Sequence, residues 1–492
     1  MALKTELFLD DLLIDKDSQV SIGEQLRSGL RKALFAGRIE AGARMPSSRF
    51  LAQTLGLGRN TVIDAYDTLI AEGYLVSHHG KGTFVAETLS AGPAHDRQTV
   101  RPQPAETGRR TSSRAQALLP LAEACLPSSG ERILEPGVPA LQAFPLERWN
   151  RCQAAANQRV GRAALSYTDP RGSLDLRRMI AAHIGPSRGV ACSPDQILLL
   201  SGMRQGLHIL MRLLLNDGAP VLLENPCLPE TRVIVEAEGA RPVAIPVTEN
   251  GADVSLLSAE QRQARLAIVT PAHQYPRGYT QAAEQRASLL AWADEQDGYI
   301  IEDDYDGEFW ITGNAIPTLY SESKNNRVIY LNSFSKSLFP ALRVSYLVLP
   351  PDLLEAAMRI RAIFDPHVSV TAQLGLIEFI GSGAYNAHLR EMRTLYRERH
   401  NVFRHALKRQ LGERITIAAQ PFGLHLCLEL DQQFQDSDIA RKLAAEGFGA
   451  QALSRYYFAP VEEKINGMVM GYAGWDAPDL LRAVKAFERL CR

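Results

Sequence analysis

Apolar residues recur every three to four positions in three separate stretches near the N-terminus. This spacing predicts three short helices, each ending at a glycine, within residues 20–37, 47–56 and 60–73. Two β-prone runs follow, residues 74–77 and 83–85, and the segment between them contains two glycines and predicts a hairpin tip. Three short helices followed by a hairpin are the elements of a winged helix-turn-helix.

A second pattern begins beyond residue 125. Apolar runs of three to six residues alternate with helical stretches, and the strand-like runs are residues 196–201, 221–224, 243–245, 266–270, 299–301, 328–331 and 344–349. This alternation predicts a mainly parallel sheet covered by helices on both faces. From about residue 385, a long helix followed by a strand predicts a smaller α+β subdomain.

Residues 86–125 lie between these two patterns and have no apolar period. The segment is rich in Pro, Gly, Ser, Thr, Gln and Arg, which predicts a flexible linker. The expected division is therefore a small helical module over residues 1–85, a linker over 86–125 and a large α/β domain over 126–492.

Composition limits the classes of function. The net charge is −1, so contact with a nucleic acid would require a local basic patch. Six cysteines are scattered without a Cys-x-x-Cys pair, which argues against a disulfide framework and a zinc site; no metal site is expected. With no signal pattern and no run of about 18 apolar residues, we expect a cytoplasmic protein.

The N-terminal module carries such a patch. Residues 20–85 contain eight Lys and Arg and five Asp and Glu, a net charge of +3. In a winged helix-turn-helix the third helix enters the major groove by its N-terminal end, and other basic residues reach phosphates. On that basis the candidate DNA contacts are Arg59, Asn60 and Thr61 on the third helix, with Arg44, Arg49 and Lys81 around it. A small protein-interaction module is the alternative.

The large domain contains a candidate nucleophile, Lys336, just past the strand-like run 328–331. A lysine at a strand end can be desolvated and form a Schiff base with an aldehyde. Ser333 and Arg343 beside it suit a phosphate group. Upstream, residues 299–301 run into Asp303 and Asp304.

Pyridoxal phosphate requires a lysine for its aldehyde, an anion facing its ring nitrogen and a phosphate cup. Lys336, one of Asp303 and Asp304, and Ser333 with Arg343 supply this set. The sequence therefore predicts pyridoxal 5'-phosphate as a cofactor of the large domain.

Two groups of motifs resemble known families. Glu302-Asp-Asp-Tyr-Asp306 with Ser333-Phe-Ser-Lys336 resembles the fold-type-I, pyridoxal-phosphate-dependent aminotransferases. Pro46-Ser-Ser-Arg49, Arg59-Asn-Thr and Gly80-Lys-Gly-Thr-Phe84 resemble the GntR-type DNA-binding domain. The whole chain is similar to the MocR subfamily of GntR regulators. This resemblance implies a multidomain protein: a mainly α winged helix-turn-helix plus an α/β aminotransferase-like domain with a small C-terminal α+β subdomain.

The resemblance also implies roles for particular residues. Lys336 matches the Schiff-base lysine, Asp303 the ring-nitrogen aspartate and Tyr305 the ring-hydroxyl ligand. His273 or Gln274 would lie near the same hydroxyl. Tyr167 matches a tyrosine that reaches the neighbouring subunit's cofactor, which implies a homodimer. The expected phosphate ligands are Ser333, Ser335 and Arg343, with the backbone of Gly202 and Met203.

The chain departs from the family pattern in three places that bear on a ligand. Leu228 stands where the family has an aromatic residue that stacks on the ring, and Arg277 stands where a small hydroxyl residue is common. Met203 and Arg204 replace the more usual small or polar pair after Gly202. An effector with a carboxylate would be bound by an arginine, and the candidates are Arg455, Arg277 and Arg232.

Three hypotheses about function follow. The first is a cytoplasmic, dimeric regulator of transcription that binds pyridoxal phosphate and senses an amine, an amino acid or the cofactor itself. The second is an active aminotransferase with an appended DNA-binding domain, since the Lys336–Asp303–Tyr305 set is equally compatible with catalysis. The third is a regulator that binds no cofactor. The complete DNA-binding module favours the first hypothesis over the second, and Lys336 and Asp303 argue against the third.

Overall fold

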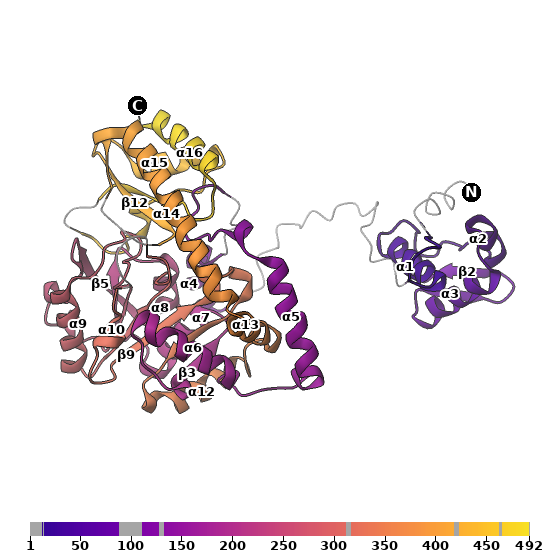
Figure 1. Ribbon diagram of the computed structural model, residues 1–492, viewed down its shortest axis with the longest axis horizontal. Coiled ribbons are helices and arrows are strands. Elements are labelled where there is room, and N and C mark those ends of the chain that lie inside the picture. The colour runs from indigo at the N-terminus through magenta and orange to yellow at the C-terminus, as the bar shows by residue number, and fades with distance from the viewer. Residues whose placement is uncertain are drawn as a thin grey trace. The chain divides into compact units, whose positions relative to one another are not determined.

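A computed structural model describes residues 12, 14–87, 111–126, 132–310, 316–417, 423–461 and 465–491. The chain divides into two compact units, residues 1–111 and 112–492 (Figure 1). Each unit is considered by itself. No helix within the described ranges is both long and apolar enough to cross a membrane.

The first unit is a winged helix-turn-helix, as the sequence predicts. Its elements are α1 (Ile22–Phe35), α2 (Ser48–Leu55), α3 (Arg59–Ala71) and the antiparallel strands β1 (Leu75–His78) and β2 (Gly82–Val85). The Ser47 side chain caps α2 by accepting a hydrogen bond from the backbone N–H of Phe50. Gly58 caps α3, which therefore begins at Arg59 and places the expected DNA contacts in its first turn.

The end of the predicted linker is helical. Ser113–Ala122 form α4, a 3-10 helix (η3) covers Glu123–Cys125, and both belong to the second unit. The Ser112 side chain accepts a hydrogen bond from Ala115 N–H at 3.1 Å, and alanine and leucine in the following turns favour a helix. The composition of the whole segment concealed this local signal. Residues 88–110 lie outside the described ranges.

An eight-stranded sheet forms the centre of the second unit. Its order is β3-β10-β9-β8-β7-β4-β5-β6. The bounds are β3 (Ile197–Leu200), β4 (Pro220–Asn225), β5 (Arg241–Thr248), β6 (Gly251–Ala252), β7 (Leu266–Val269), β8 (Tyr299–Asp303), β9 (Val328–Ser333) and β10 (Ser345–Val348). Neighbours from β5 to β9 pair in parallel, and β10 is antiparallel to both β9 and β3. The carboxyl ends of β4, β7, β8 and β9 therefore meet at one edge.

Both faces of this sheet are covered because successive strand side chains point to opposite faces. Leu198 and Leu200 pack in one apolar cluster with residues of α7 and α8, while Ile197 and Leu199 pack in another with residues of α6 and α13. The helices around the sheet are α5 (Leu146–Val160), α6 (Leu174–Arg188), α7 (Met203–Leu214), α8 (Pro229–Ala237), α9 (Ala283–Glu295), α10 (Leu319–Glu322), α11 (Phe334–Ser337), α12 (Pro351–Phe364) and α13 (Val370–Gly381).

The C-terminal part forms the smaller α+β subdomain that the sequence predicts. Figure 1 shows it in orange and yellow, as a layer beyond the end of the long helix α14. An antiparallel sheet of order β11-β12-β14-β13 lies in this layer with α15 and α16. The bounds are α14 (Ala384–Leu411), β11 (Ile415–Ile417), β12 (His425–Leu430), α15 (Asp436–Ala445), β13 (Gln451–Ala452), β14 (Gly467–Gly471) and α16 (Ala477–Leu490).

Candidate functional site

A cavity of about 410 Å³ lies where the parallel strands end. Strand-end residues line it, among them Glu224 near the end of β4, Thr270 just after β7, Asp303 at the end of β8 and Ser333 at the end of β9. Open α/β sheets bind ligands at this edge. The subdomain and the helical end of the linker complete the wall, with Leu424, His425, Arg455 and Tyr456 from the former and Glu123, Ala124 and Leu126 from the latter.

Lys336 projects into this cavity from the short helix α11. Its Nζ donates a hydrogen bond of 2.7 Å to the carbonyl oxygen of Gly137. Burial lowers the pKa of the Lys336 amine, and the negative charges of Asp306, Glu230 and Asp303 oppose the lowering. The amine thus reaches its neutral, nucleophilic form more readily than an exposed lysine, which is what attack on an aldehyde requires.

Three consecutive acids at the end of β8 point to three different places. Asp303 lines the cavity, where burial raises the pKa of its carboxyl to about 7, helped by the charges of Asp304 and Asp306. Glu302 faces the other way and accepts hydrogen bonds from the backbone N–H groups of Leu319 and Tyr320. Of the two aspartates between which the residues alone did not decide, Asp303 is the one that faces the cavity.

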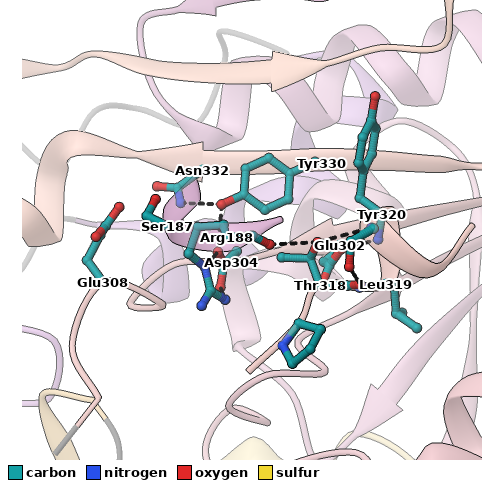
Figure 2. Close-up of polar contacts among 12 residues, drawn as sticks. Ser187, Arg188, Glu302, Asp304, Glu308, Thr318, Leu319, Tyr320, Tyr330 and Asn332 are labelled. Atoms are coloured by element: carbon teal, nitrogen blue, oxygen red, sulfur yellow. Dashed lines mark hydrogen bonds and ion pairs between the residues drawn. The ribbon is translucent and has the colours of Figure 1, made fainter. Parts of the chain in front are cut away.

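Asp304 belongs to a buried polar network, shown in Figure 2. Arg188 Nε and Nη2 each donate to its carboxylate at 2.7 Å, and the Tyr330 hydroxyl donates to it at 2.6 Å. Asn332 Nδ2 in turn donates to the Tyr330 hydroxyl oxygen at 2.8 Å. The network fixes the end of β8 to α6 and β9, and so holds the neighbouring Asp303 in position.

The expected phosphate ligands lie together at the start of α7. Gly202 precedes this helix with a positive φ of 141°, and a side chain there would collide with the guanidinium of Arg343. Ser333 Oγ donates to Ser335 Oγ at 2.9 Å, and Met203 opens the helix. Free N–H groups at a helix N-terminus, two hydroxyls and an arginine are the groups that could hold a phosphate dianion here.

Tyr305 is held beside the cavity by His273. Its hydroxyl oxygen lies 2.8 Å from His273 Nδ1, and that nitrogen lies 2.9 Å from Asp306 Oδ2. Neither His273 nor Gln274 is among the lining residues that the structure describes, and Tyr275 lines the cavity in their place. Gln274 instead donates to the carbonyl oxygens of Pro226 and Tyr275.

His273, Asp306 and His425 form a buried group whose ligand-type atoms lie within 4.8 Å of one another. The sequence predicted no metal site. Among the residues that the structure describes, this group has ligand-type atoms close enough together to hold a metal ion. Burial lowers the pKa of His425 to about 4, and its Nε2 lies 3.0 Å from the carbonyl oxygen of Pro276. The contacts of His273 with Asp306 and Tyr305 hold the Tyr305 hydroxyl at this group.

The residues around the cavity fit pyridoxal phosphate. Three kinds of group face this cavity: the Lys336 amine, the Asp303 carboxyl with its raised pKa, and the candidate phosphate ligands. A side chain at position 202 would obstruct the phosphate position. Lys336 would hold the aldehyde carbon, Asp303 the ring nitrogen and Tyr305 the ring hydroxyl. Leu228 lines the cavity as well and offers an apolar surface where the family has an aromatic ring.

The three candidate effector arginines lie in different surroundings. Arg455 lines the cavity, is exposed, and donates to Gln451 Oε1 at 2.7 Å. Arg277 is buried and bonds Glu429 and Tyr279, and Arg232 lies 3.7 Å from Glu236 on its own helix. The described lining of the cavity includes neither Arg277 nor Arg232.

The lining also includes residues that were not expected from the sequence, among them Glu123, Glu224, Glu230 and Tyr275. A signal existed for Glu224, because it ends an apolar run just as Asp303 does. Burial raises the pKa of the Glu224 carboxyl to about 7, and the Thr270 hydroxyl donates to it at 2.6 Å.

Tyr167 lies on the surface, with 82% of its area exposed. It is not among the described residues that line the cavity of its own chain, and its ring contacts His367 at a centroid distance of 5.7 Å. Two further apolar residues close to this pair in the sequence are exposed. Leu165, two residues before Tyr167, is 85% exposed, and Ile363, four residues before His367, is 74% exposed.

The candidate DNA contacts are accessible on the first unit. Arg44, Arg49, Arg59, Asn60 and Lys81 are exposed and Thr61 is half-buried. Arg44 forms a β-bridge with Phe84 and its guanidinium lies beside Gly82 at the hairpin. The first turn of α3 and the hairpin therefore present basic and polar side chains.

Comparison with known proteins agrees with this geometry. Residues 22–85 match the family described as bacterial regulatory proteins, gntR family, and residues 142–466 match aminotransferase class I and II. The chain is 33% identical to the probable rhizopine catabolism regulatory protein MocR of Rhizobium meliloti, over 97% of this chain and 95% of that one. It is 30% identical to the pyridoxine biosynthesis transcriptional regulator PdxR of Corynebacterium glutamicum, over 96% and 97%.

Among solved structures, the second unit resembles the α-aminoadipate aminotransferase LysN of Thermus thermophilus, complexed with N-(5'-phosphopyridoxyl)-L-leucine. The TM-score is 0.67 at 26% identity, over 78% of this chain and 95% of LysN. The protein is a transcription regulator whose aminotransferase-like domain binds pyridoxal phosphate. With a gntR-type DNA-binding domain and a full-length match to MocR, the chain belongs to the MocR subfamily of GntR-type regulators.

Proposed function

We propose that the cavity beside Lys336 senses a small amine or amino acid and that its occupancy changes binding of the first unit to DNA. One observation supports this proposal. The cavity contains the residues that could hold the cofactor and also groups that the cofactor does not need, such as Arg455 and Tyr456. An aminotransferase with an appended domain is the less favoured alternative, because the relatives over the full length are regulators.

The residues of the cavity have distinct parts in this function. Bound pyridoxal phosphate supplies a carbon that is electrophilic toward primary amines. The lowered pKa of Lys336 lets its amine accept or release a proton near the reacting atom. Asp303 gains a counter-charge when a protonated ring nitrogen faces it, and Arg455 is placed to bind a carboxylate.

The direct test combines two measurements on the full chain. An amine that changes the visible absorbance of the bound cofactor should also change affinity for promoter DNA, with the same concentration dependence. An absorbance response with unchanged DNA affinity would favour the enzyme alternative over the regulator.

The protein should act in the cytoplasm as a homodimer. Aminotransferase-fold proteins are typically dimeric, and Leu165, Tyr167 and Ile363 are exposed apolar side chains of the kind found at interfaces. We expect Tyr167 to complete the phosphate cup of the partner subunit.

The dimer predicts a specific result. Ile363→Glu should convert a dimer into monomers at micromolar concentration in analytical ultracentrifugation, because it would bury a charge in the interface. Tyr167→Phe should remain dimeric and bind the cofactor about tenfold more weakly, as expected for one lost hydrogen bond to a charged group. Leu481→Glu on α16, at another exposed apolar position, is the control. A monomeric wild type with bound cofactor would contradict the arrangement.

Reading of DNA by α3 is testable in the same chain. Arg59→Ala should cost about 1–3 kcal/mol on the native promoter and relax the base preference at one position. Arg49→Ala and Lys81→Ala should weaken all sequences alike and flatten the dependence of binding on salt, because phosphate contacts carry no sequence information. Footprinting with salt titrations distinguishes the two classes. Unchanged affinity and preference in Arg59→Ala would rule out α3 as the reading helix.

A further inference from the structure

The cavity lining carries more charge than the cofactor requires. Lys336, Asp303 and Arg343 serve the cofactor, and the remaining charged groups are Glu123, Glu135, Arg204, Glu224, Glu230 and Arg455. Most of these already have partners. Arg204 Nη1 donates to the carbonyl oxygen of Cys125 at 2.6 Å, Glu224 accepts from Thr270, and Arg455 donates to Gln451.

Among the remaining carboxylates, Glu123 is exposed and Glu135 is buried, whereas Glu230 is half-buried. It lies in the first turn of α8, is half-buried, and faces the cavity. Within the ranges that the structure describes, its carboxylate makes no hydrogen bond and no ion pair. A half-buried carboxylate that makes no direct ion pair can accept an ammonium group from a ligand, although the Lys336 amine lies within reach of its charge.

The electrostatic field of Glu230 reaches the reacting end of the cavity. Its charge opposes the burial effect on Lys336 more strongly than that of Asp303 does. It also adds to the burial that raises the pKa values of Tyr275 and Tyr456, which line the same cavity. Leu228, two residues earlier, supplies apolar contact between the helix and the cavity.

We propose that Glu230 sets the effector specificity of this chain by binding a second cationic group on an effector amine. The effector class is therefore a diamine or a basic amino acid, whose first amine would replace the Lys336 amine at the cofactor carbon, releasing Lys336 as a free amine, and whose distal ammonium pairs with Glu230. This inference rests on the proposed function and narrows it. Monoamines lack the second charge, and a distal carboxylate would be repelled by Glu230.

The two sources of a distal ammonium differ in one group. A basic amino acid also carries a carboxylate, for which Arg455 is available in the lining, whereas a diamine does not. Comparing putrescine with butylamine isolates the distal ammonium, and comparing ornithine with norvaline isolates it in the presence of a carboxylate. Comparing ornithine with putrescine then reports the part played by Arg455.

The test uses the full chain with bound cofactor, titrated with each amine and followed by visible absorbance and by promoter affinity. Putrescine should bind about tenfold to a hundredfold more tightly than butylamine, as expected for one charge-assisted hydrogen bond. Glu230→Gln should remove most of that preference, measured as the ratio of the putrescine and butylamine affinities within the same variant. Glu230→Lys should reverse it, favouring 4-aminobutyrate over putrescine.

Glu236→Gln is the matched control, since it makes the same change on the same helix at a residue that is not among the described lining. A purely structural role for Glu230 at the helix N-terminus would lower the melting temperature of Glu230→Gln but keep the diamine preference, and that result would overturn the inference. Equal binding of butylamine and putrescine by the wild type would also overturn it, with the proposed function intact. If no amine changes the absorbance or the promoter affinity of the cofactor-bound protein, both the inference and the proposed function are wrong.

Discussion

Lys336→Ala should abolish the visible absorbance of the lysine-bound cofactor and, with it, the response of DNA binding to amines. No other lysine lines the cavity within the described ranges, so none is placed to replace the covalent attachment. Borohydride reduction followed by mass spectrometry of the peptides should find the cofactor on residue 336 in the wild type and on no lysine in the variant.

Two further variants make the result interpretable. Lys336→Arg keeps the charge and a donor for the carbonyl oxygen of Gly137 but forms no Schiff base, so it should fold normally and lack the absorbance. Lys324→Ala, at an exposed loop lysine, should behave as wild type. A reducible adduct at a different lysine in Lys336→Ala would show that the attachment site is wrongly assigned.

Asp304→Asn should reduce the free energy of unfolding of the second unit by about 3–5 kcal/mol, because it leaves the buried Arg188 charge without its counter-charge. Both side chains of this pair are almost inaccessible, at 0% and 1% exposed. Urea unfolding, followed by tyrosine and tryptophan fluorescence, measures the change. Cofactor affinity should fall as well, because Asp303 is held in place through its neighbour.

The exposed pair Arg359–Glu355, at 79% and 73% exposed, is the control. Glu355→Gln should change stability by less than about 0.5 kcal/mol, since solvent screens such a pair. The double variant Arg188→Met with Asp304→Leu should lose less stability than the two single changes summed, because it removes both charges together. Additive losses would mean that Arg188 and Asp304 do not act as a pair.

The sequence predicted the architecture well because its signals are local. Apolar period, caps and turn residues identified the winged helix-turn-helix, the sheet and the smaller subdomain. The MocR-type family and the cofactor were confirmed as well. Lys336 and one of Asp303 and Asp304 could be proposed because they stand at the carboxyl ends of apolar runs, where parallel strands present ligand groups, and the family resemblance singled out Asp303.

What the sequence left open depends on partners far along the chain. Asp303 and Asp304 are equivalent as residue types, and within the structure the pairing of Asp304 with Arg188, 116 positions earlier, separates them. In the same way, His273 contacts Asp306 and Gln274 donates a hydrogen bond to the carbonyl oxygen of Pro226. Neither is among the described lining residues, and Tyr275 lines the cavity instead. Glu230 carried no signal at all, since an acidic residue in the first turn of a helix is ordinary.

The helical end of the linker has a practical consequence for dividing this protein into parts. Glu123 and Ala124 line the cavity, yet they precede residue 126, where composition alone ends the linker. A fragment cut at that boundary would retain Lys336, Asp303 and the phosphate cup while lacking two residues of the wall and the carbonyl oxygen of Cys125 that receives the Arg204 hydrogen bond. Ligand affinities measured on such a fragment would describe an incomplete pocket, whereas a cut before Ser112 would keep the pocket whole.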